Sequence, residues 1–143
     1  MILNIIKYGD ENTTKLRKKS IDVKKENYFL QTLIDDMFET LENSGNGIGL
    51  AAPQVGKNLN LFIIKIDDYK EVFINPEIKL EGLDIQVKEG CLSFPNLEFA
   101  VDRRETVRVK YFDRNWVQRL VEFKGILSII VQHEYDHLKG KLI

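Results

Sequence analysis

The sequence predicts an α+β fold, with antiparallel strands packed around a central helix near the C-terminus and an amphipathic helix nearer the N-terminus. Two stretches have helical periodicity, residues 25 to 42 and 126 to 139, and one stretch, residues 105 to 123, alternates apolar and polar residues as a half-buried strand pair does. Strands precede and follow the first helix without a regular strand-helix alternation, which argues against a parallel doubly wound sheet.

Size and composition limit the possible classes of protein. The chain has 143 residues and a formal net charge of −1, so we expect one domain, residues 1 to 143, that binds neither nucleic acid directly nor a membrane. No apolar run is long enough to span a bilayer and the N-terminus lacks a basic leader, which favours a cytoplasmic protein. A single cysteine excludes an internal disulfide.

The N-terminal half contains the first expected helix. Met1 to Ile6 is apolar and predicts a strand or a segment that plugs the core. Residues 25 to 42 form the expected helix because six apolar residues follow helical spacing, namely Leu30, Leu33, Ile34, Met37, Phe38 and Leu41. Asn43 to Gly47 is rich in turn-forming residues and ends it.

Strands are expected in the middle of the chain. Residues 59 to 66 and 71 to 74 are apolar and short, and Asn75-Pro76 predicts a turn after them. Residues 105 to 123 predict a hairpin, with its turn at residues 113 to 115.

The last expected helix, residues 126 to 139, lies between Gly125 and Gly140. Its one face carries three isoleucines and both histidines of the chain, namely Ile126, Ile129, Ile130, His133 and His137. It is apolar over most of its circumference, which predicts a helix at the centre of the fold.

His133 and His137 are four residues apart, so their imidazoles project from one side of this helix and can share a metal ion, with Glu134 beside them as a general base. Two histidines buried for structural reasons are the alternative, but unpaired imidazoles on an apolar face would be costly. Cys91 is the candidate third ligand, although a lone cysteine is more often inert core.

A glycine-punctuated loop, Gly47 to Gly56, carries one amide side chain, Gln54. Its spacing fits neither a P-loop nor a dinucleotide fingerprint. A simple tight turn before the next strand explains this segment equally well.

Together three segments resemble the peptide deformylase family: Gly-Ile-Gly-Leu-Ala-Ala-Pro-Gln ending at Gln54, Glu-Gly-Cys-Leu-Ser around Cys91, and Gln-His-Glu-Tyr-Asp-His ending at His137. Similarity continues through residues 35 to 40 and 74 to 77, so it covers nearly the whole chain. The resemblance implies a metal-dependent hydrolase that removes the N-formyl group from the initiator methionine of nascent polypeptides and releases formate.

The resemblance also implies roles for individual residues. Cys91, His133 and His137 bind one divalent ion, with Fe(II) expected in the cell and Zn, Ni or Co also suitable. Glu134 takes a proton from the attacking water and passes one to the departing amine, while Gln54 and the backbone N–H of Leu92 stabilise the negative charge on the former formyl oxygen.

The implied substrate is an N-formylmethionyl peptide. Its methionine would enter an apolar pocket formed by Ile48 with the three isoleucines Ile126, Ile129 and Ile130, and its backbone would add as a strand beside Ile48, Gly49 and Gly90. The ribosome is a further candidate partner, and a monomer is expected.

Two features depart from most bacterial members. They continue into a further C-terminal helix that is missing here, as in short viral members, and we expect activity without it. Glu98 stands where many relatives carry a basic residue near the cleft, which predicts a different preference for downstream peptide residues. A zinc peptidase and a metal-bound peptide-binding module without turnover are the rival functions.

Overall fold

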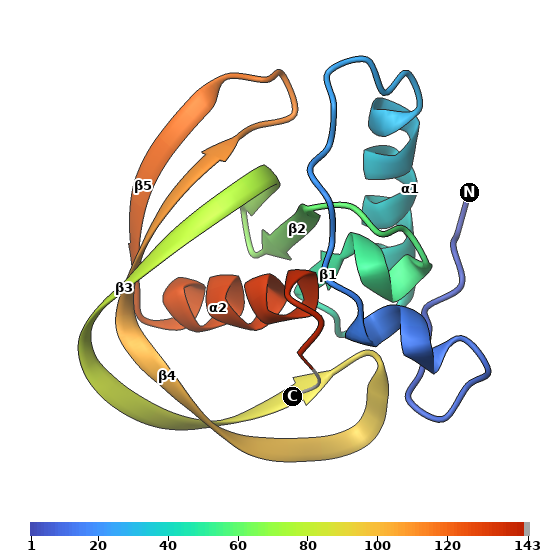
Figure 1. Cartoon of the computed structure of the whole chain (residues 1–143). Helices are drawn as coiled ribbons and strands as arrows, with labels where there is room; N and C mark the ends of the chain where they lie inside the picture. Colours follow the sequence, from blue (N-terminus) through green and yellow to red (C-terminus); the bar gives the residue numbers. More distant parts are fainter. Residues whose placement is uncertain (142–143) are drawn as a thin grey trace.

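A computed structural model describes residues 1–141, whereas Leu142 and Ile143 lie outside the described part. Five antiparallel strands form one sheet in the order β1-β2-β3-β4-β5, accompanied by two α-helices and two short 3-10 helices (Figure 1). The elements in chain order are η1 (Thr13–Arg17), α1 (Leu30–Asn43), β1 (Gly49–Ala51), η2 (Ala52–Val55), β2 (Leu61–Ile66), β3 (Tyr69–Cys91), β4 (Phe94–Phe112), β5 (Gln118–Lys124) and α2 (Ile126–Leu138). The predicted α+β class is confirmed.

Strand β2 separates two hydrophobic clusters. Leu61 and Ile63 point to one face, where they pack with the apolar side of α1, and Phe62 and Ile64 point to the other, where they pack with residues of β4, β5 and α2. Side chains alternate along a strand, so a strand covered on both faces must be apolar throughout. This explains the unbroken apolar run in the sequence.

Strands β3 and β4 form a long hairpin that curves around α2 (Figure 1). Register shifts between Ile74 and Glu77, between Glu81 and Asp84, and between Gly90 and Cys91 interrupt the pairing. Such bulges bend a strand and increase its twist. The curvature therefore brings the far end of the hairpin, where Cys91 lies, back toward the helix.

Asn75-Pro76 is not the predicted turn. β3 runs through it, and Asn75 occupies the first register shift with a left-handed φ of 51°. Its side chain accepts a hydrogen bond from the Val23 N–H (2.7 Å) and donates one to the Val23 carbonyl (3.0 Å). Asn tolerates left-handed backbone better than most residues, so the Asn-Pro pair here occupies a β-bulge instead of a turn. Through the Asn75 side chain, this bulge holds the segment around Val23 against β3.

Three other segments can be compared with the expectations. α1 begins at Leu30 rather than residue 25, because Lys24 and Asn27 close a turn before it. Of the two alternatives for Met1 to Ile6, the core-plugging segment is confirmed and the strand is not: Ile6 is buried and donates its N–H to the Gln54 carbonyl (2.7 Å), and Leu3 and Ile5 pack against the core. The segment 47–56 is more ordered than a turn, since it contains β1 and η2.

Helix α2 matches its predicted range closely, and its side chain Gln132 fastens it to β4. The Gln132 amide accepts a hydrogen bond from the Arg104 N–H (3.0 Å) and donates one to the Arg104 carbonyl (2.8 Å). This pair of bonds fixes the helix against the strand one residue before His133. Among residues 1–141, no helix is long and apolar enough to cross a membrane.

The anchoring by Asn75 gives a stability prediction. Asn75→Ala should lower the free energy of unfolding by about 2 to 3 kcal/mol, because two hydrogen bonds to Val23 are lost and alanine disfavours a positive φ. Asn75→Gly loses the same bonds but accommodates the backbone, so its loss should be smaller. Urea unfolding at a fixed metal concentration measures both, and a wild-type midpoint for Asn75→Ala would contradict the anchoring.

Candidate metal centre and adjoining cleft

Cys91, His133 and His137 converge although 46 residues separate the first from the last. Cys91 is the last residue of β3, and the histidines lie one turn apart on α2. One ligand atom from each residue lies within 4.8 Å of the others, and the Cys91 Sγ is 3.3 Å from the His137 Nε2. One sulfur and two imidazole nitrogens at this spacing fit a tetrahedral divalent ion with one position left for another ligand.

Buried acid and base groups hold His133 in place. The His133 Nδ1 lies 2.7 Å from the Glu89 carboxylate, which leaves Nε2 as the nitrogen available to a metal. Glu89 is paired through both oxygens with the Arg103 guanidinium (2.7 and 2.8 Å), and Arg103 also reaches Asp136 (2.6 Å). Arg103 is only 5% exposed and Glu89 is buried as well, so their pairing is shielded from water, whereas Asp136 is partly exposed.

The same network sets the protonation of Glu89 and the histidines. Burial raises the pKa of Glu89, but hydrogen bonds from Arg103 and His133 outweigh it and hold the pKa near about 2. Burial lowers the pKa of His133, but interactions with Cys91 and Glu89 outweigh it and raise the pKa to about 10, whereas burial lowers the pKa of His137 to about 3. Protons and a metal ion would therefore compete for His133.

Glu134 is buried beside the three ligands without a partner for one of its oxygens. Its Oε1 has no hydrogen bond among the described residues, and burial raises the pKa of the carboxyl to about 7. A Cβ placed on Gly49 would come within 2.5 Å of the Glu134 Oε2. The carboxylate thus needs a glycine in β1, and its pKa suits proton transfer near neutral pH.

Gln54, in η2, presents its amide nitrogen to the same centre. The Gln54 Oε1 accepts a hydrogen bond from the Ala51 N–H (2.9 Å), which orients the amide. The Nε2 then lies 3.2 Å from the Ser93 Oγ and 3.6 Å from the Cys91 Sγ. A fixed donor beside a metal site can stabilise negative charge that develops on a bound carbonyl oxygen.

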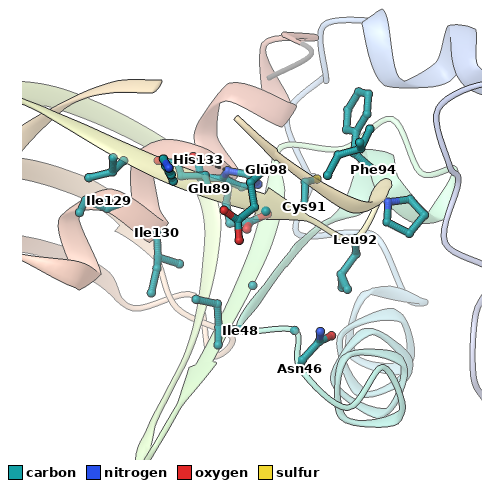
Figure 2. A pocket seen from close by; sticks show the side chains of 18 of the residues that line it. Asn46, Ile48, Glu89, Cys91, Leu92, Phe94, Glu98, Ile129, Ile130 and His133 are labelled. Carbon is teal, nitrogen blue, oxygen red and sulfur yellow. Dashed lines mark hydrogen bonds and ion pairs between the residues drawn. The ribbon is translucent and has the colours of Figure 1, made fainter. Parts of the chain in front are cut away.

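A cleft of about 920 Å³ opens beside this centre (Figure 2). All the predicted site residues except the buried His137, which contacts Cys91, line the cleft: Ile48, Gly49, Gln54, Gly90, Cys91, Leu92, Ile126, Ile129, Ile130, His133 and Glu134. Ile130 is buried, whereas Ile48 and Ile126 are 39% and 59% exposed. The sequence-predicted site is therefore one continuous surface.

Two strand edges border the cleft. β1 is the edge strand of the sheet, and β3 pairs with β2 only over residues 69–74, so residues 77–91 pair with β4 alone within the described chain. Residues 47–49 of the β1 segment and residues 87–92 at the end of β3 line the same cleft. An extended peptide between them would find backbone hydrogen-bonding groups on both sides.

No role for Glu89, Arg103 or Asp136 is predicted from the sequence. Glu89 and Asp136 lie close in sequence to the predicted ligands Cys91 and His137, and this proximity is the feature that could have indicated a role for them. Arg103 has no such neighbour in the sequence. Its position across from Ile85 depends on the register of a hairpin that the sequence does not reveal.

Comparison with known proteins assigns the chain to a family. The family model described as polypeptide deformylase matches residues 2–143. A peptide deformylase of Karelsulcia muelleri is 45% identical, over 99% of this chain and 76% of that protein. Peptide deformylase 1 of Shewanella oneidensis is 44% identical, over 99% of this chain and 83% of its own length.

Solved structures agree with this assignment. A peptide deformylase from Synechococcus elongatus, in complex with actinonin, has 38% identity and a TM-score of 0.91, covering 98% of this chain and 75% of that one. A probable peptide deformylase from Synechococcus phage S-SSM7 has 33% identity and a TM-score of 0.89, covering 98% of this chain and 96% of that one. The chain belongs to the polypeptide deformylase family, and it is an enzyme that removes the N-formyl group from nascent polypeptide chains.

Proposed function

We propose that Cys91, His133 and His137 hold the divalent ion on which deformylation depends, and that α2 is the metal-binding helix around which the strands pack. The observation that carries this proposal is the convergence of the three donor atoms at the base of the cleft. Glu89 would orient His133 through Nδ1.

When bound, the ion supplies a Lewis acid that polarises the formyl carbonyl and makes a water molecule easier to deprotonate. We expect ferrous iron in the cell. Zinc, nickel and cobalt also suit one thiolate with two imidazoles, so metal analysis of protein purified without oxygen identifies the native ion.

Glu134 would move the protons of the reaction. Its carboxylate can accept a proton from water as the formyl carbon is attacked, and can then give a proton to the departing amine. A pKa of about 7 allows both transfers near neutral pH. The unpartnered Oε1 is a free acceptor, and Gly49 leaves the carboxylate the space it needs.

Gln54 and Leu92 would stabilise the tetrahedral intermediate. Negative charge develops on the former formyl oxygen, and the Gln54 amide and the Leu92 backbone N–H would donate hydrogen bonds to it. The contact between the Gln54 Nε2 and the Cys91 Sγ supports this role because it places the donor beside the ligand set.

The methionine side chain would lie against the isoleucines of the cleft, Ile48, Ile126, Ile129 and Ile130, three of which are labelled in Figure 2. The peptide backbone would run between β1 at Gly49 and β3 at Gly90. Recognition through main-chain bonds tolerates many sequences, which suits an enzyme that acts on nascent chains in general.

Further proposals concern the setting of the reaction. We propose that residues 1 to 143 form one catalytic domain that works as a cytoplasmic monomer and meets its substrates at the ribosome. The net charge of −1 supports action without direct nucleic-acid binding and without attachment to an anionic membrane surface.

The first test is formate release. The iron-loaded protein should release formate from formyl-Met-Ala-Ser and leave the unformylated peptide intact, whereas Glu134→Gln should keep the metal and fall close to background, because it cannot accept a proton. Formate assay, amine detection and metal analysis measure these results. Internal cleavage would indicate a peptidase, and full activity of Glu134→Gln would exclude Glu134 as the base.

The role of Gln54 gives a second prediction. Gln54→Ala should lower kcat by about 10²- to 10³-fold with metal content and circular dichroism unchanged, because a donor used mainly in the transition state is lost. Ser93→Ala is the matched control; it removes only a group that contacts the Gln54 amide, so its loss should be much smaller. An unchanged rate for Gln54→Ala would remove Gln54 from the mechanism.

The orientation of His133 gives a third prediction. Glu89→Gln keeps the shape of the side chain but weakens its bond to His133 and its pairing with Arg103, so in variant protein that keeps the wild-type circular dichroism, zinc affinity should fall by about 10- to 100-fold in chelator competition. Glu77→Gln, an exposed position on the same strand, should leave the affinity unchanged. Equal affinities for the two variants would show that Glu89 does not orient the ligand.

A further inference from the structure

Glu98 places an exposed carboxylate in the lining of the cleft (Figure 2). It lies on β4, directly across from Gly90 of β3, in the row before the tip of the hairpin at Cys91. Among residues 1–141, its side chain forms no ion pair or hydrogen bond that would neutralise it. The mechanism above does not use it.

Gly90 leaves the approach to Glu98 open. The space where a Gly90 side chain would lie is nearly empty: a Cβ placed there would have the Leu97 carbonyl oxygen, at 3.7 Å, as its one near neighbour. Directly opposed residues of an antiparallel pair lie about 5 Å apart, within the reach of a glutamate side chain. Glu98 lies on the strand paired with one edge of β3, and its side chain can reach across Gly90 toward the open edge along which the peptide backbone is proposed to run; both residues line the cleft.

Most other charges near the cleft are neutralised or buried. Glu89 is paired with Arg103 and His133, and Glu134 is buried at the base. Lys88 is exposed and unpaired, but it lies across from Ala100, two residues further from Cys91, or about 6 to 7 Å along the strand. The first exposed charge outward from the ligand cluster is therefore the negative charge of Glu98.

We propose that Glu98 selects among formylated peptides by charge, favouring substrates with a lysine or arginine at the second or third residue over those with an acidic residue there. This inference rests on the proposed function, because it assumes that the peptide runs outward from the metal centre along β3. The selection adds to a backbone-mediated recognition that otherwise ignores these side chains.

The expected effect is modest because Glu98 is exposed. Exposed ion pairs change an equilibrium by a few-fold, so we expect about a threefold advantage of a cationic over a neutral peptide and a similar disadvantage of an acidic one. The contact is the same in the bound substrate and in the transition state, so the difference should appear in KM rather than in kcat. It should shrink as salt concentration rises.

The test compares kcat/KM for formyl-Met-Ala-Lys, formyl-Met-Ala-Gln and formyl-Met-Ala-Glu, and for the corresponding peptides with the variable residue at position two. Wild type should prefer lysine, Glu98→Gln should abolish this preference, and Glu98→Lys should make glutamate the preferred residue. Glu122→Gln, on β5 outside the cleft, removes the same charge and should keep the wild-type preference.

Different results would overturn charge selection by Glu98 and the proposed function. If all variants release formate from formyl-Met-Ala-Ser but Glu98→Gln and Glu98→Lys keep the wild-type preference, or if wild type shows none, charge selection by Glu98 is overturned and the proposed function stands. If the iron-loaded wild type releases no formate from any peptide, both are overturned.

Discussion

The buried ion-pair network of Arg103 is the interaction on which the rest of the site depends. The guanidinium of one β4 residue joins Glu89 of β3 to Asp136 of α2, and Glu89 in turn fixes His133. Removing one partner of such a network leaves an uncompensated buried charge, at a cost of about 3 to 5 kcal/mol. The pairing therefore fixes α2 against the curved hairpin, and with it the position of His133 in the proposed metal site.

The curvature of the β3–β4 hairpin explains how Cys91, at the end of a long strand, comes to lie beside the histidines of α2. Bulges near residues 75, 82 and 91 bend β3 and β4 around α2. As a result β3, which passes through the core at Val72, ends with Cys91 beside His137. On the other side, α1 packs under β2 and holds the segment that carries Gln54 and Gly49. The proposed ligands, hydrogen-bond donor and proton carrier thus come from three segments, β3, α2 and η2, that the fold brings together.

Elements with local periodicity were predictable, and those that depend on register were not. The apolar face of α2 and the spacing of its histidines are visible in the sequence, which explains why its range and the convergence of its side chains were anticipated. Residues 77 to 104 bury few side chains fully; Ile78, Leu80, Ile85 and Val87 do alternate with polar residues, but this weak strand pattern does not reveal which segment pairs with which. Arg103 acquires its partners only through that pairing, and Asn75 becomes a bulge only because the strand continues.

The open edges of β1 and β3 can bind peptides of many sequences, but they can also pair with strands of other molecules. An unpaired edge offers hydrogen bonds to any extended chain, which favours substrates of many sequences but also unwanted pairing with other strands. Here residues of both edges line one cleft, and two charged residues, Lys88 on β3 and Glu98 on β4, are exposed in its lining. Because backbone hydrogen bonds cannot distinguish one side chain from another beyond the first residue, charged side chains in the lining are the groups that can do so, and they can also discourage edge-to-edge association.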